Sequence, residues 1–246
     1  MEDIGTIPAP DGTPLAYRRI AGRGPGVLFL GGFNSDMTGT KAAALAEWAQ
    51  RTGRGFCRFD YAGHGASGGE FAEGTIGRWA ADATMVLDAL TEGPQIPVGS
   101  SMGGWIAALL ARARPARVAA LVGIAPAPDF TEDLMWENFP ADVRAAIARD
   151  GVWHRPSEYG EDYPITRALI EDGRRNLVLR EKLPFAFPVR ILQGMRDLDV
   201  PWRHAQRFVD AIEGDDVRLT LVKDGDHRLS RPQDLALLLR EIEEMG

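Results

Sequence analysis

Short apolar runs recur along the chain, each bounded by glycine, proline or charged residues, and this pattern predicts buried strands. The predicted strands are 26–32, 55–60, 95–101, 117–124, 189–193 and 217–222. The runs are nearly continuous rather than alternating with polar positions, which is typical of parallel strands covered on both faces. By contrast, residues 13–20 alternate apolar and polar side chains and suit an antiparallel edge strand.

Segments with helical spacing lie between the predicted strands. One of them places apolar side chains along one face of a helix at Trp79, Ala83, Val86 and Leu90. Gly93 suits its end, and an apolar-striped helix over 235–245 closes the chain. Regular alternation of strand and helix predicts an α/β protein with helices on both faces of a mostly parallel sheet.

This alternation breaks between Ala127 and Pro188, where about 60 residues replace a short connection. The segment is rich in aromatic residues and in the helix breakers proline and glycine, which suggests short helices folded over an apolar space. We expect residues 129–185 to form a lid or cap, with 1–128 and 186–246 forming the core. The alternative is an ordinary surface excursion whose aromatic side chains pack on the sheet.

Composition narrows the classes of function. The chain has 246 residues, 45% of them apolar, and a net charge of −7 without a dense basic cluster, which disfavours nucleic acid as a partner. No apolar run approaches the length of a membrane span. The single cysteine, Cys57, and the lack of a secretory or targeting pattern at the N-terminus predict a cytoplasmic location. A removed transit peptide stays open as an alternative, and the sequence leaves the oligomeric state open.

A candidate nucleophile follows the third predicted strand. Residues 99–103 read Gly-Ser-Ser-Met-Gly and match G-x-S-x-G, in which a sharp strand-to-helix turn lifts the serine out of the sheet. Ser101 has glycine at both −2 and +2, whereas Ser100 does not. We expect the backbone N–H groups of Met102 and Phe33 to form an oxyanion hole, since Phe33 follows two glycines after the first predicted buried strand.

The acid and the base are sought after the late strands, in that order. Asp197 lies in the loop after 189–193, with Asp199 as the reserve candidate or a helix cap. His227 is the histidine that falls in a loop after the last predicted strand. A Ser101–His227–Asp197 triad would perform acyl transfer to water through an acyl-enzyme, with neither a metal nor a cofactor.

A second glycine motif could indicate dinucleotide binding. Residues 63–68 match G-x-G-x-x-G and Asp82 follows at about the dinucleotide-binding spacing. However, the next helical pattern starts only near Thr75, so these glycines do not open a helix. We therefore expect no dinucleotide site here.

Several motifs together resemble the α/β-hydrolase superfamily, namely residues 58–67 and 99–105. Residues 34–41, 194–202, 226–228 and parts of 151–159 are similar to the mitochondrial abhydrolase-domain palmitoyl-protein thioesterases and acyl-glucuronide esterases. The resemblance implies the α/β-hydrolase fold and hydrolysis of thioesters or esters of apolar acyl groups, from small molecules or acylated proteins. Departures include Gly31-Gly32-Phe33 in the oxyanion loop.

The lid aromatics Trp136, Trp153 and Tyr159 are candidate substrate-binding residues. Two alternatives remain open. The same triad would serve a general carboxylesterase or a C–C bond hydrolase, and a ligand receptor with slow turnover would keep the same pocket.

Overall fold

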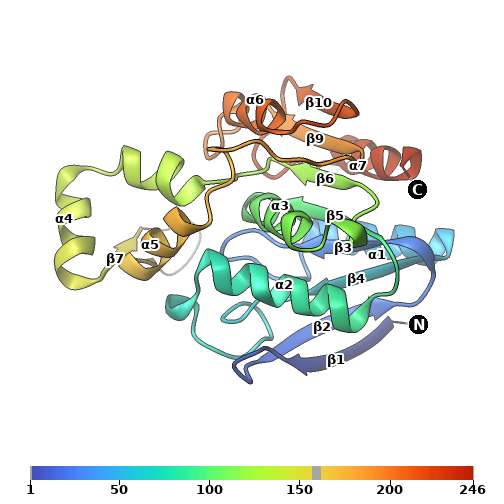
Figure 1. The fold of residues 1–246 in the computed structure, drawn as a ribbon, viewed down its shortest axis with the longest axis horizontal. Coiled ribbons are helices and arrows are strands. Elements are labelled where there is room, and N and C mark those ends of the chain that lie inside the picture. The colour runs from blue at the N-terminus through green and yellow to red at the C-terminus, as the bar shows by residue number, and fades with distance from the viewer. Residues whose placement is uncertain (1, 157–161, 246) are drawn as a thin grey trace.

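The computed structural model describes residues 2–156 and 162–245, and their centre is an eight-stranded sheet in the order β1-β2-β4-β3-β5-β6-β9-β10 (Figure 1). Its strands are β1 (Glu2–Pro8), β2 (Pro14–Ile20), β3 (Arg23–Leu30), β4 (Arg54–Phe59), β5 (Gln95–Ser100), β6 (Leu121–Ile124), β9 (Val189–Gly194) and β10 (Val217–Val222). In the order of the sheet, the six strands from β4 to β10 are parallel to one another. β2 pairs antiparallel with both β4 and β1. The predicted mostly parallel sheet is confirmed.

Two details of the sheet differ from expectation. The strand predicted at 13–20 is antiparallel but does not lie at the edge, because β1 pairs along its outer side. β1 has only two large apolar side chains, Ile4 and Ile7, and its residues are half-buried or exposed, so it carries little hydrophobic signal. The strand predicted from 117 begins at Leu121, because Pro115–Arg117 form a 3₁₀ turn.

Helices cover both faces of the sheet. They are α1 (Thr40–Thr52), α2 (Ile76–Leu90), α3 (Met102–Ala113), α6 (Trp202–Ala211) and α7 (Pro232–Glu244). Successive strand residues point to opposite faces. Val27 and Phe29 pack in the cluster under α1 and α7, whereas Leu28 and Leu30 pack in the cluster under α2, α3 and α6. This close packing on both sides explains the continuous apolar runs.

The segment between β6 and β9 projects from one side of the core (Figure 1). It contains a π-helical turn (Thr131–Met135), a 3₁₀ turn (Trp136–Asn138), α4 (Ala141–Asp150), β7 (Val152–Arg155), β8 (Tyr163–Thr166) and α5 (Arg167–Arg175). We call the described part of 129–185 the cap. Short helices were expected, but β7 and β8 also form an antiparallel hairpin that the sequence pattern did not predict.

A buried carboxylate joins the two ends of the cap. Asp129 accepts hydrogen bonds from Val178 N (2.7 Å) and Leu179 N (3.0 Å), about 50 residues later in the chain. Its side chain is fully buried, and Arg180 lies 3.5 Å from it. Desolvation by burial raises the pKa of Asp129, and the two amide donors oppose that shift. The entry and exit of the cap are therefore fixed to each other.

Candidate active site

Ser101 occupies a strained turn between β5 and α3. Its φ of 55° and ψ of −117° are unusual for a residue with a side chain. A β-carbon at Gly99 would overlap the carbonyl oxygen of Gly103, and one at Gly103 would overlap the carbonyl oxygen of Leu30. Close backbone packing thus requires glycine on both sides of Ser101, at the spacing found in the sequence.

The three candidate triad residues meet at the carboxyl ends of the parallel strands. His227 Nε2 lies 3.1 Å from Ser101 Oγ, and His227 Nδ1 lies 2.8 Å from Asp197 Oδ2. The residues come from loops after β5, β9 and β10, and 126 positions separate Ser101 from His227. Hydrogen bonds therefore connect Asp197, His227 and Ser101 in one line.

Several hydrogen bonds fix the carboxylate of Asp197 in place. Its side chain is fully buried, and its Oδ1 accepts hydrogen bonds from Asp199 N (2.9 Å) and Val200 N (2.8 Å). Its Oδ2 accepts a further one from Gln193 Nε2 (3.0 Å), in addition to facing His227. These donors stabilise the carboxylate and fix its plane. Gln193 lies near the end of the buried strand β9, and the only sign of its role in the sequence is a polar residue in an apolar run.

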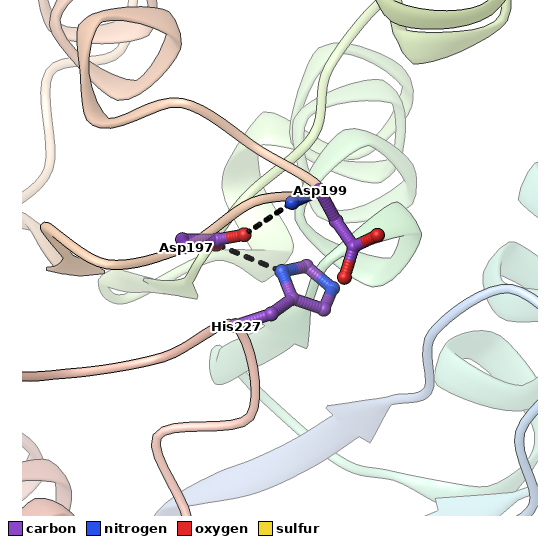
Figure 2. Close-up of side chains that lie close together, drawn as sticks. All are labelled: Asp197, Asp199 and His227. Carbon is purple, nitrogen blue, oxygen red and sulfur yellow. Dashed lines mark hydrogen bonds and ion pairs between the residues drawn. The ribbon is translucent and has the colours of Figure 1, made fainter. Parts of the chain in front are cut away.

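Asp199 takes a different position, with its carboxylate beside the imidazole ring and its backbone N–H on Asp197 (Figure 2). Oxygen and nitrogen atoms of Asp197, Asp199 and His227 lie within 4.8 Å of one another, as in a metal site. However, Nδ1 of His227 already faces Asp197 and Nε2 faces Ser101. A metal ligand needs a free imidazole lone pair, so this donor set fits proton transfer better than metal binding.

The two predicted oxyanion donors flank Ser101. Met102 begins α3, so its N–H has no acceptor one turn earlier in the helix. Phe33 lies in the loop after β3, and a β-carbon at its neighbour Gly32 would lie 3.5 Å from Ser101 Cβ. Within the described residues, Phe33 N donates no hydrogen bond to another protein group. Both amides therefore belong to residues next to the turn of Ser101 and stay candidates for the oxyanion hole.

A cavity of about 340 Å³ opens from Ser101 towards the cap. Most of the residues that line it are apolar, although polar atoms make up the larger part of its exposed surface; the apolar residues include Phe33, Met102, Phe130, Leu134, Met135, Tyr163, Leu198 and Val200. Two charged residues, Arg155 of the cap and Asp199 of the core, also line it. The cap thus contributes directly to the space beside Ser101.

Two of the three aromatic residues singled out from the sequence, Trp136 and Trp153, lie elsewhere in the cap. Trp136 packs under the guanidinium of Arg174, and Trp153 packs against Phe139. Neither lines the cavity beside Ser101, whereas Phe130 and Tyr163 do. Tyr159 lies outside the described residues. The aromatic content of the segment identified the cap. It did not tell which rings reach the site, because that depends on how the cap packs and not on the neighbouring sequence.

A second cavity of about 330 Å³ lies on the other side of Ser101 and His227. More of its lining residues are polar, among them Ser35, Asp36, Thr40, Lys41 and Arg228. Phe33 borders both cavities, as do Ser101 and His227. Ser101 therefore lies between two cavities that differ in the residue types around them.

Two further histidines, His64 and His204, have structural surroundings. His64 is buried among Phe71, Trp79 and Tyr61, and desolvation lowers its pKa to about 4. His204 is buried on α6, where Nε2 lies 2.6 Å from the carbonyl oxygen of Pro128, and burial lowers its pKa.

The loop at 63–68 has a structural explanation too. Asp60 accepts a hydrogen bond from Ala66 N (2.9 Å), and Asp82 accepts one from Ala62 N (3.0 Å). The next long helix, α2, begins only at Ile76. Because the glycines do not open a helix, they cannot place a pyrophosphate on its N-terminus.

The fold and the position of Ser101 define the class of protein, a serine hydrolase with the α/β-hydrolase fold. Residues 26–156 match the family described as serine aminopeptidase, S33. Palmitoyl-protein thioesterase ABHD10, mitochondrial, from Bos taurus is 39% identical over 244 residues, 98% of this chain and 79% of that protein. The Mus musculus protein of the same name is 40% identical over 233 residues, 94% of this chain and 78% of that protein.

Solved structures agree with these relatives. A putative hydrolase from Agrobacterium vitis S4 is 45% identical with a TM-score of 0.95, and the match covers 100% of this chain and 99% of that one. Alpha/beta hydrolase domain-containing protein 10 from mouse is 38% identical with a TM-score of 0.91, covering 98% and 97%. The chain belongs to the ABHD10 family of α/β hydrolases. It is an enzyme, a serine hydrolase of the esterase and thioesterase type.

The comparisons also correct the expected location. All five curated relatives are named as mitochondrial proteins, which contradicts the cytoplasmic prediction. That prediction relied on the single cysteine and on the lack of a targeting pattern, and a low cysteine content is equally compatible with other reducing compartments. Among the described residues, no helix has the length and apolar character needed to cross a membrane.

Proposed function

We propose that the chain hydrolyses thioesters and esters of apolar acyl groups through an acyl-enzyme on Ser101. His227 acts as the general base and acid, Asp197 orients it, and the N–H groups of Met102 and Phe33 bind the oxyanion. The observation that carries the proposal is the line of hydrogen bonds from Asp197 through His227 to Ser101, which ends beside a cavity lined mainly by apolar residues.

Acylation would begin when Ser101 Oγ attacks the substrate carbonyl carbon while its proton passes to His227 Nε2, 3.1 Å away. The imidazolium that forms is stabilised by the buried Asp197 carboxylate, 2.8 Å from Nδ1. The tetrahedral oxyanion lies against the two backbone amides. When it collapses, the bond to the leaving thiol or alcohol breaks, and His227 returns the proton to that group.

Deacylation would repeat the same steps with water. His227 takes a proton from water, the hydroxide formed attacks the acyl carbon, and the proton returns to Ser101 Oγ as the carboxylic acid leaves. All of these proton transfers pass through one imidazole, whose orientation is set by Asp197 and, through it, by Gln193. No step requires a metal ion or a redox cofactor.

The apolar cavity supports binding of the acyl group on the cap side. Side chains of the cap and the core surround this space, and burial of acyl methylenes there is favourable by about 0.8 kcal/mol each. The name of the relatives, palmitoyl-protein thioesterase, indicates a long-chain acyl group on a protein as the first substrate to test. The second cavity, which more polar residues line, is left for the leaving group.

Reaction with a fluorophosphonate, followed by intact-mass measurement, tests the nucleophile. One adduct is expected on the wild type and on Ser100→Ala, which removes the neighbouring buried hydroxyl, and none on Ser101→Ala. Turnover of a palmitoyl thioester should fall about 10⁶-fold in Ser101→Ala, the usual effect of losing the serine of a triad. An adduct on Ser101→Ala, or none on the wild type, would refute the proposal.

A further inference from the structure

A lysine from a distant part of the chain contacts the loop that carries His227. Lys41 lies in the first turn of α1, and its Nζ donates a hydrogen bond of 2.6 Å to the carbonyl oxygen of Arg228. Ser230 Oγ accepts from the same ammonium at 3.4 Å. Arg228 directly follows His227, so this bond fixes the backbone one residue from the imidazole.

Other hydrogen bonds of this loop are mostly local. Leu229 N donates to Asp226 Oδ1 (3.0 Å), and Ser230 Oγ donates to the carbonyl oxygen of Arg228 (3.0 Å). These bonds shape the turn, and Arg196 N also donates to the carbonyl oxygen of Gly225 (2.9 Å), which joins the loop to the one after β9. None of these bonds reaches α1. Lys41 instead connects the loop to α1, which follows the loop that carries the Phe33 amide.

The surroundings of Lys41 are unfavourable for a charge. Its side chain is half-buried, and desolvation lowers the pKa of Lys41 to about 8; the carboxylate of Asp226 opposes this shift and Arg228 adds to it. Lys41 also lines the second cavity beside Ser101 and His227. The amine therefore lies beside the site while its two acceptors hold it on the loop of His227.

We propose that Lys41 is a positioning residue: it holds the loop after β10 so that His227 Nε2 stays 3.1 Å from Ser101 Oγ. This inference depends on the proposed role of His227. A shift of about 1 Å in the base lowers turnover by roughly a hundredfold, so the contribution of Lys41 belongs to the chemical step and not to substrate affinity.

The test compares Lys41→Met, Lys41→Gln and Lys41→Arg with Lys182→Met as the matched control. Lys182 Nζ also donates to a backbone carbonyl, that of Asp210 at 2.6 Å, but it is exposed and away from His227. We expect Lys41→Met and Lys41→Gln to lower kcat about 10- to 100-fold with KM nearly unchanged, and to slow fluorophosphonate labelling by a similar factor. Lys41→Arg, which keeps a cationic donor, should recover most of the activity, and Lys182→Met should match the wild type.

Three outcomes would overturn the inference: full kcat in a folded Lys41→Met or Lys41→Gln variant, a rise in KM at unchanged kcat, or no recovery by Lys41→Arg. The second outcome would make Lys41 a substrate contact. Thermal melts identify the folded variants, and Lys41→Gln decides the question if Lys41→Met does not fold. A wild type that fails to label would instead refute the proposed function, so the two failures are distinguishable.

Discussion

At the scale of single residues, the site separates two neighbouring aspartates by their surroundings. Asp197 is buried and faces His227 Nδ1, whereas Asp199 is exposed to the cavity and contributes its backbone N–H to Asp197. The sequence offered both as candidates for the acid. Burial and hydrogen bonding, which depend on where the loop folds back, favour Asp197 for that role.

Replacing this acid should leave the fold intact but impair turnover. In Asp197→Asn an amide faces His227 Nδ1, which favours the wrong tautomer of the imidazole, and kcat is expected to fall about 10⁴-fold. Steady-state kinetics with a thioester substrate measures this fall. Asp199→Asn is the control and should keep most of the activity, because its carboxylate forms no hydrogen bond to the imidazole in the described structure. Equal losses in the two variants would contradict the assignment.

At the scale of elements, the cap determines the shape of the apolar cavity. The π-helical turn contributes Leu134 and Met135, and β8 contributes Tyr163. Asp129 fixes the ends of the cap to each other, and α5 reaches back to α2, where Gly77 N donates to Asp172 Oδ2 (2.6 Å). The cap is therefore held against the core on more than one side.

Filling the cavity from the cap should shorten the preferred acyl chain. Leu134 is half-buried and lines this space, so the larger side chain in Leu134→Trp removes room for the distal methylenes. We expect kcat/KM for a palmitoyl ester to fall at least about tenfold, while that for an acetyl ester changes little, since each methylene contributes a few-fold or more. Rates across an acyl-length series measure the effect.

Glu137→Trp is the matched control for that change. Glu137 is exposed on the adjoining 3₁₀ turn and is absent from the cavity walls, so a tryptophan there should leave the chain-length profile unaltered. A parallel fall for acetyl and palmitoyl esters in Leu134→Trp would argue against acyl binding on the cap side.

At the scale of the whole molecule, buried ionisable groups make stability depend on pH. The folded-state pKa of His64, about 4, lies below its usual value because burial disfavours the imidazolium. The unfolded chain therefore binds a proton at this position first, and stability is lost as the pH falls from about 6.5 towards 4. Asp82 acts in the opposite sense, because burial raises its pKa to about 6 and acid relieves that cost.

A variant without a titratable group at position 64 isolates the contribution of His64 to the pH dependence of stability. His64→Phe keeps an aromatic ring among Phe71, Trp79 and Tyr61 but cannot bind a proton. Between pH 7.5 and pH 5, the wild type should lose roughly 2 kcal/mol more unfolding free energy than the variant, given about 1.4 kcal/mol per pKa unit. Urea unfolding at the two pH values measures this difference. Equal losses of unfolding free energy in the wild type and the variant would show that His64 is protonated as easily in the folded state as in the unfolded one.

What the sequence by itself determined about this protein follows from short-range constraints. Continuous apolar runs specify strands buried on both faces, and alternation with helices specifies a parallel sheet. The turn between β5 and α3 requires the glycines around Ser101 and spans only a few residues, so it could be recognised as a sequence motif. The order of acid and base after the nucleophile follows from the same sheet.

Which distant residues act together depends on tertiary contacts. β1 has only two large apolar side chains and is a strand because β2 offers it an edge, and the cap hairpin forms over apolar positions too few to predict it. Lys41 reaches the loop of His227 through hydrogen bonds across the fold, and Gln193 reaches Asp197 because the loop after β9 folds back on the strand; no local pattern exists for either contact. The rings that line the cavity differ from those in contact with other cap residues because of packing, a property of all neighbours at once.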